Sequence, residues 1–204
     1  MDTAPQTELP RIAVITGSTR PGRRTDQVAV WVHRRATDHL HGRAEVVTVD
    51  LADQDLPLLD EPLPAAFGEY RHPHTRRWAE LVGAFDGFVF VVPEYNHSMP
   101  AAVKNAIDYL YAEWNDKAAG FVSFGIHGGV RAAEHLRLVL AETKTACVRT
   151  TVALNLFADF DVPDIRQRGT FAPAEHHEPA LLRMLDEVVE WSTALRTIRA
   201  GRAS

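Results

Sequence analysis

The sequence is poor in cysteine and in lysine. Cys147 is the single cysteine of 204 residues, which rules out an internal disulfide, a zinc site of four cysteines and an iron–sulfur cluster held by this chain alone. Lysine occurs only at three positions, and arginine supplies the other cationic side chains, a bias that we attribute to genomic composition. The 22 basic residues are outnumbered by 27 acidic ones, and a net charge of -5 argues against a nucleic-acid partner.

Long apolar runs are also missing. No run approaches the roughly 20 residues that a membrane span needs, and residues 1–10 are polar and contain proline, without the apolar stretch of a signal peptide. We therefore expect a cytoplasmic protein with no membrane partner. Hydrophobic residues at 46% and charged residues at 24% are typical of a globular chain. The length predicts one domain over residues 1–204, with a core at 11–154 and a C-terminal loop and helix at 155–200.

Short apolar runs alternate with longer amphipathic ones along the chain. The pattern predicts strands at 11–16, 44–49, 85–92, 119–124 and 147–154, and helices at 25–39, 75–84, 130–144, 179–199 and from Pro100 onward. Residues 52–74 and 157–179 are predicted to be irregular. Such alternation predicts an α/β fold with a parallel sheet and helices on both faces. Ligands of these folds bind beyond the carboxyl ends of the strands, which selects the loops after the first, third and fourth strands.

The first loop, GSTRPGRRT at residues 17–25, leaves a buried strand and enters a helix. Backbone N–H groups at a helix start favour an anion, and hydroxyl and guanidinium groups here can bind phosphate oxygens. The loop matches neither a P-loop, which needs a lysine, nor the GxGxxG dinucleotide fingerprint. A strand-to-helix turn with solvated arginines is the alternative.

The second loop, PEYNHSMP at 93–100, and the third loop, SFGIHGG at 123–129, combine polar groups with glycines. Their backbone can meet the edge and face of a planar ring; alternatively, the second is a turn with Ser98 as helix N-cap and the third a loop that needs positive φ angles. We favour a surface position for His127. One ligand with a phosphate and a planar ring explains all three loops, and FMN has both.

Three segments resemble the NADPH-dependent FMN reductases of the flavodoxin-like fold, namely GSTRPGR at 17–23, PEYNHSMPAAVKNAID at 93–108 and FVSFGIHGGVRAAEHLR at 121–137. The resemblance spans about residues 11–154. It implies a flavodoxin-like three-layer sandwich with a five-stranded parallel sheet in the order 2-1-3-4-5. It also implies tight FMN binding, NADPH or NADH as hydride donor, and a homodimer or tetramer with the flavin near the subunit interface.

The resemblance also implies roles for individual residues. The FMN phosphate would be held by Ser18, Arg20, Arg23 and Thr25, with Gln27 close by. The ring and ribityl chain would contact Pro93, Glu94, Tyr95 and Asn96, and the other side of the ring would face Ser123, Gly125, Gly128 and Gly129. Many relatives have small residues in place of Ile126 and His127, and the segment 157–177 is expected to cover either the site or a partner subunit.

The expected function is hydride transfer from NADPH to FMN, followed by electron transfer to free flavin, a quinone or a similar acceptor. One use of such a reaction is to supply reduced flavin to a monooxygenase. No catalytic side chain is assigned, because the cofactor carries the chemistry. A flavodoxin-type electron carrier and a flavin-bound redox-regulatory protein are the alternatives. We expect no metal site: the pairs His72/His74 and His176/His177 are interpreted as exposed loop histidines, and Asp159, Asp161 and Asp164 as solvated loop charges.

Overall fold

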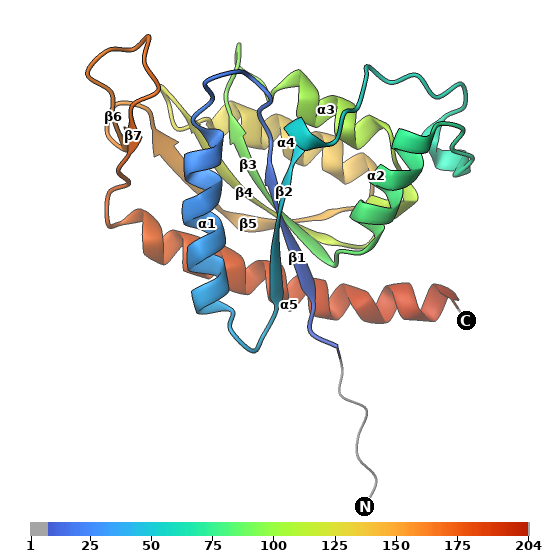
Figure 1. The fold of residues 1–204 in the computed structure, drawn as a ribbon. Coiled ribbons are helices and arrows are strands. Elements are labelled where there is room, and N and C mark those ends of the chain that lie inside the picture. Colours follow the sequence, from blue (N-terminus) through green and yellow to red (C-terminus); the bar gives the residue numbers. More distant parts are fainter. Residues whose placement is uncertain (1–7, 204) are drawn as a thin grey trace, which may run out of the picture.

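Five parallel strands form the central sheet of the computed structural model, which describes residues 8–203 (Figure 1). The strand order is β2-β1-β3-β4-β5. The strands are β1 Arg11–Thr16, β2 Glu45–Asp50, β3 Gly87–Pro93, β4 Ala118–Gly125 and β5 Ala146–Asn155. The order 2-1-3-4-5 and the parallel pairing are confirmed, and the observed strand ends lie within two residues of the predicted ones.

Helices cover both faces of the sheet and make it the middle of three layers (Figure 1). The helices are α1 Thr25–His39, α2 Pro73–Gly83, α3 Ala101–Asp108, α4 Val130–Glu142 and α5 His177–Ala203. In β1, Ile12 and Val14 pack with α1 and α5, whereas Ala13 and Ile15 pack with the other three helices. This split follows from the alternation of side chains along a strand. The flavodoxin-like three-layer fold is therefore confirmed.

The C-terminal helix α5 is longer than the predicted 179–199 and is anchored to the amino end of the sheet. The Arg196 guanidinium donates to both carboxylate oxygens of Asp86, at 2.8 and 2.7 Å, and Arg199 forms a second ion pair with it. Burial acts to raise the pKa of Asp86, but the hydrogen bonds from Arg196 and from the Arg11 N–H outweigh it and hold that pKa below its ordinary value. No helix among residues 8–203 is both long enough and apolar enough to cross a membrane.

The long segment between β2 and α2 is irregular, as predicted, and contains two short 3₁₀ turns, η1 Leu51–Asp53 and η2 Ala65–Phe67. Contacts with the end of α3 hold it in place. The Asn105 amide donates to the Pro57 carbonyl at 2.7 Å and accepts from the Leu59 N–H at 2.9 Å. The helix α2 begins two residues before the predicted Thr75, because Pro73 is well tolerated in a first helical turn.

The segment between β5 and α5 is more ordered than predicted. It contains an antiparallel ribbon of β6 Phe160–Asp161 and β7 Thr170–Phe171. The Phe160 ring packs against Phe124 and Phe171, with centroids 5.6 and 5.0 Å apart, so aromatic burial stabilises the ribbon. The ribbon lies at the same end of the sheet as the loop after β1 (Figure 1).

Two ionisable side chains near this ribbon, Asp159 and His177, are buried, whereas the sequence predicts solvated loop groups. Asp159 is 2% exposed, accepts from the N–H groups of Asn155 and Ala174, and contacts the His177 ring at 3.0 Å. His177 is also buried, at the start of α5, whereas His176 is exposed. The solvated interpretation was wrong for Asp159 and His177, because the segment folds back on itself and pairs the two side chains with each other. The interpretation as an exposed loop residue was also wrong for His74, which lies in α2 with its side chain 18% exposed.

Candidate functional site

The three loops selected from the sequence meet at the carboxyl edge of the sheet. The first and second loops are joined by a 2.9 Å hydrogen bond between the Ser18 and Tyr95 hydroxyls. The Glu94 N–H donates to the Phe124 carbonyl at 2.9 Å, which joins the second loop to the end of β4. The loops after β1, β3 and β4 therefore form one continuous surface, as the rule for open parallel sheets predicts.

A basic hollow of about 320 Å³ opens at the first loop. It is lined by Thr19, Arg20, Pro21, Gly22, Arg23, Asp26, Ala52 and Arg168. Three guanidinium groups against one carboxylate in this lining favour an anion. We refer to it below as the basic hollow.

Two arginines of the first loop have different environments. The Arg23 guanidinium is only 18% exposed, donates to the Ser18 carbonyl at 2.7 Å and forms an ion pair with Asp50 at the end of β2. Arg20 is exposed, and its guanidinium carbon lies 6.0 Å from the centre of the Tyr95 ring. Arg23 therefore braces the loop, whereas the Arg20 guanidinium makes no hydrogen bond or ion pair within residues 8–203.

Thr25 is the first residue of α1 and carries an unusual buried hydroxyl. Its Oγ1 is buried and has no hydrogen-bond partner among the described residues. No side chain caps this helix start either. A buried polar atom left unpaired costs about 1–3 kcal/mol, and a helix start attracts anions. The hydroxyl thus fits a phosphate oxygen as its missing partner, next to residues that line the basic hollow.

The second loop contains a tight turn that exposes its tip. Tyr95 and Ser98 exchange backbone hydrogen bonds of 2.9 and 3.0 Å, and Asn96 and His97 between them have φ angles of 50° and 65°. Two successive positive φ angles are the signature of a type I′ turn. The expectation that Ser98 caps a helix was wrong: Pro100 precedes the first residue of α3, and the Ser98 hydroxyl instead contacts the His135 ring at 3.1 Å.

The side chain of Glu94 is directed to the start of α4. Its two carboxylate oxygens accept from the Arg131 N–H at 3.1 Å and from the Arg131 guanidinium at 2.9 Å. Because its carboxylate is held in this way, Glu94 can contact a ligand mainly through its backbone. The expectation of backbone contacts with a ligand for residues 93–96 stays a prediction.

The third loop is shaped by glycines. Gly128 and Gly129 have φ angles of 76° and 69°, and a Cβ at Gly129 would lie 2.6 Å from the Phe124 nitrogen. Only glycine fits this combination of backbone and space. The buried Ser123 hydroxyl donates to the Gly128 carbonyl at 2.8 Å, so it stabilises the loop from below. His127 is exposed, as expected.

The β6–β7 ribbon packs on the start of α1 in its own chain, beside the first loop. The Gln27 amide donates to the Gly169 carbonyl at 3.2 Å and accepts from the Phe171 N–H at 2.9 Å. Arg168 forms an ion pair with Asp26 and lines the basic hollow. Sequence reasoning missed Arg168, because nothing in the local pattern of an irregular segment indicates its return to the first loop.

Comparisons with known proteins show the family of this chain. A model of the family described as NADPH-dependent FMN reductase matches residues 10–159. An NAD(P)H-dependent FMN reductase of a Nectria species is 34% identical over 197 residues, covering 89% of this chain and 96% of that protein. One of Schizosaccharomyces pombe is 41% identical over 152 residues, covering 74% of this chain and 75% of the other.

A solved structure gives the same fold. The flavoenzyme NAD(P)H:(acceptor) oxidoreductase of Paracoccus denitrificans matches with a TM-score of 0.67 at 21% identity, covering 91% of this chain and 98% of that one. At this identity the likeness concerns the fold alone.

Proposed function

Because the chain belongs to the NADPH-dependent FMN reductase family, we propose that it holds FMN across the three loops at the carboxyl edge of its sheet. The chain is an NAD(P)H-dependent FMN reductase and hence an oxidoreductase. The observation that carries the placement of the cofactor is the buried, unpartnered hydroxyl of Thr25 beside the basic hollow. A phosphate there satisfies the hydroxyl, the free N–H groups of the helix start and the arginines together.

The residues of the first loop divide into phosphate ligands and residues that position them. Arg20 and Thr25 contact the phosphate directly, since their polar groups have no hydrogen-bond partner within residues 8–203. Ser18 and Arg23 contribute from positions that their contacts with Tyr95 and Asp50 already hold. Gln27 acts indirectly: its side chain is hydrogen-bonded to the β6–β7 ribbon, which places Arg168 at the basic hollow.

The ring of the cofactor lies between the second and third loops. Pro93, Glu94, Tyr95 and Asn96 contact it from one side, chiefly through their backbone, and Gly125, Gly128 and Gly129 let the other side approach closely. Ser123 acts through the Gly128 carbonyl that it binds. A Cβ at Gly125 would lie 3.3 Å from the Glu94 Cβ, which is the point where the two loops meet.

Bound FMN supplies the chemistry by accepting a hydride from NADPH or NADH and passing electrons to a second acceptor. The described chain offers one sheet and one set of three loops for both reactants, so we expect them to use the same surface in turn. Initial-rate plots against the donor at several acceptor concentrations should therefore be parallel; lines that converge would contradict this. Free flavin and quinones are the acceptors to compare.

His127 is exposed at the tip of the third loop, and we assign it no proton-donor role. The variant His127→Ala is expected to leave the turnover of a quinone acceptor and its pH profile unchanged. A loss of turnover that follows the protonation of an imidazole would assign the donor role to His127 instead.

An absorption spectrum of the purified protein tests the proposal. We expect a flavin spectrum after desalting that bleaches when NADPH is added without oxygen. A flavin spectrum that persists with both NADPH and NADH would favour a carrier or a redox-regulatory protein. Failure to bind added FMN would overturn the placement of the cofactor.

We also infer a homodimer or tetramer with the flavin near the interface. Three apolar side chains at the third loop and on α4 are exposed: Ile126 by 57%, Val130 by 44% and Leu138 by 73%. Leu138 borders a mainly apolar hollow of about 430 Å³ beside the second loop. A second copy would cover these groups. Light scattering should give a multiple of the chain mass, and Leu138→Glu should shift it to the monomer; a monomeric wild type would contradict the inference.

A further inference from the structure

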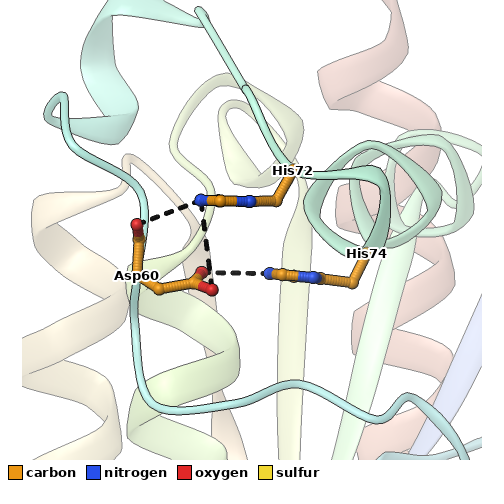
Figure 2. Close-up of side chains that lie close together, drawn as sticks. All are labelled: Asp60, His72 and His74. Atoms are coloured by element: carbon orange, nitrogen blue, oxygen red, sulfur yellow. Dashed lines mark hydrogen bonds and ion pairs between the residues drawn. The ribbon is translucent and has the colours of Figure 1, made fainter.

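A second cluster of polar side chains lies outside the flavin site, between the segment that follows η1 and the start of α2. It consists of Asp60, His72 and His74 (Figure 2). The His74 Nε2 lies 3.0 Å from one carboxylate oxygen of Asp60, and the His72 Nε2 lies 4.0 Å from the other. The two imidazoles are stacked, with centroids 5.1 Å apart and planes 4° from parallel, and both Nε2 atoms lie on the side of Asp60. The His72 Nε2 is hydrogen-bonded to the Asp60 backbone carbonyl at 3.2 Å. We call these three residues the Asp60 cluster.

The surrounding contacts hold the Asp60 cluster in place. The Tyr109 hydroxyl donates to Asp60 Oδ1 at 2.9 Å. The same hydroxyl lies 3.2 Å from the Pro57 carbonyl and 3.4 Å from the Leu58 carbonyl. The Glu61 carboxylate accepts from the N–H groups of Arg71 and His72, with shortest distances of 2.9 Å. It thereby joins the segment around Asp60 to the segment that enters α2.

The carboxylate of the cluster accepts an outer hydrogen bond from the Tyr109 hydroxyl and faces both imidazole rings. A charged carboxylate with an outer hydrogen bond, facing two imidazole nitrogens, is the arrangement that supports a metal ligand set.

We propose that the Asp60 cluster is a binding site for Zn²⁺, with Asp60 and the Nε2 atoms of His72 and His74 as its ligands. The three ligand atoms lie within 4.8 Å of one another. Ligands of a tetrahedral zinc lie about 2.0–2.2 Å from the metal and hence roughly 3.4 Å apart, so shifts of about 1 Å close the set on one ion. Water completes the coordination.

The chemistry of the ligands selects the class of metal. Two imidazoles with one carboxylate suit Zn²⁺ and its transition-metal neighbours, whereas Mg²⁺ and Ca²⁺ prefer all-oxygen sites. The bound ion replaces the hydrogen bond of His74 with the Asp60 carboxylate and that of His72 with the Asp60 carbonyl, and it links the segment after η1 to the first turn of α2. This role is independent of the flavin, since neither the three loops nor the basic hollow includes a residue of the cluster.

Titration of the metal-free, untagged full-length protein with Zn²⁺ against a chromophoric chelator tests the site. We expect one Zn²⁺ per chain, no competition from excess Mg²⁺ or Ca²⁺, and a melting temperature that rises with Zn²⁺. His74→Ala and Asp60→Asn should each weaken binding by well over tenfold. Tyr109→Phe, which removes the outer hydrogen bond to Asp60 together with the contacts to the Pro57 and Leu58 carbonyls, should weaken it by about tenfold.

The control is His41→Ala, which removes an exposed histidine after α1 and should leave Zn²⁺ affinity unchanged. His72→Ala provides a second ligand variant that changes no buried residue, so a folding defect in one variant leaves the question decidable. Cobalt substitution gives an independent readout, since its visible absorption should require all three ligands. The proposal is overturned if wild type binds Zn²⁺ no tighter than the His74→Ala variant does. The Asp60 cluster would then be a set of hydrogen-bonded side chains that binds no metal. The flavin spectrum, recorded in the same samples, is expected to be unchanged by these substitutions.

Discussion

The separation of Arg20 from Arg23 leads to the sharpest prediction about the phosphate site. The exposed Arg20 guanidinium makes no hydrogen bond or ion pair within residues 8–203, so removing it leaves the fold intact. A hydrogen bond to a charged group contributes about 1.5–3 kcal/mol, which corresponds to a roughly 10- to 140-fold change in dissociation constant. Because solvent screens an exposed charge, we expect the lower end of this range for Arg20→Ala, about tenfold.

The assay compares FMN with riboflavin, which has the same ring but no phosphate. Fluorescence quenching of each flavin by apoprotein should show that Arg20→Ala weakens FMN binding about tenfold and leaves riboflavin binding unchanged. Arg23→Ala should weaken both flavins and lower the free energy of unfolding, because it removes the brace on Ser18 and leaves Asp50 unpaired. Arg77→Ala, on the exposed face of α2, is the matched control. Equal losses for FMN and riboflavin with Arg20→Ala, or no loss for either, would refute the assignment.

Three further substitutions test the site and the fold. Thr25→Val removes the unpaired buried hydroxyl, so flavin-free protein should be as stable as wild type or more stable by up to about 1 kcal/mol in urea unfolding, while FMN binding falls about fivefold. A stability loss would show that the hydroxyl has a protein partner. Gly129→Ala should lower the free energy of unfolding by at least about 2 kcal/mol, because the φ of Gly129 is 69° and a Cβ there would clash with the Phe124 backbone. Gly42→Ala is the control: Gly42 has a φ of 72° but open space around it, so the loss should be about 1 kcal/mol. Equal losses would contradict the role of crowding. Burial opposes the ionisation of Asp86, but Arg196 and its other partners lower the pKa below 3.8, so its stabilisation is present above about pH 4 and is lost as the pH falls through the folded-state value. Asp86→Asn should therefore lower the free energy of unfolding by about 2–3 kcal/mol at pH 7. Below pH 4 the free energy of unfolding should fall less steeply with pH in the variant than in wild type; equal slopes would reject this role of Asp86.

The fold could be predicted because its signals are local. The runs RIAVIT and FDGFVFVV consist mostly of β-branched or aromatic residues and become β1 and β3, which are buried on both faces. The strand order, by contrast, came from the resemblance to a family, since alternating elements alone allow several orders. The ribbon at Phe160 and Phe171 could not be predicted, because two-residue strands have no periodicity and depend on packing against β4.

The candidate site could be predicted as three loops, but not as individual contacts. The glycines and hydroxyls of the first and third loops indicate a ligand, yet nothing local shows that Arg23 pairs with Asp50, 27 positions away. Gln27 and Ser123 are near the ligand in sequence, but their polar atoms are used on Gly169 and Gly128. A long-range partner converts a candidate ligand into a positioning residue, and only the folded arrangement distinguishes the two.

These internal contacts explain how so small a chain can bind a phosphate at a helix start. The Ser18–Tyr95 bond, the Arg23–Asp50 pair and the Ser123–Gly128 bond are all made between groups of the chain itself, so the loops are supported by their own contacts. Preorganisation reduces the entropy lost on binding. Few groups are then left for the phosphate itself, and the Arg20 guanidinium and the Thr25 hydroxyl are two that have no hydrogen-bond partner within residues 8–203. The division predicts that losses at these two are specific to the phosphate, whereas losses at the bracing residues extend to every flavin and to the fold.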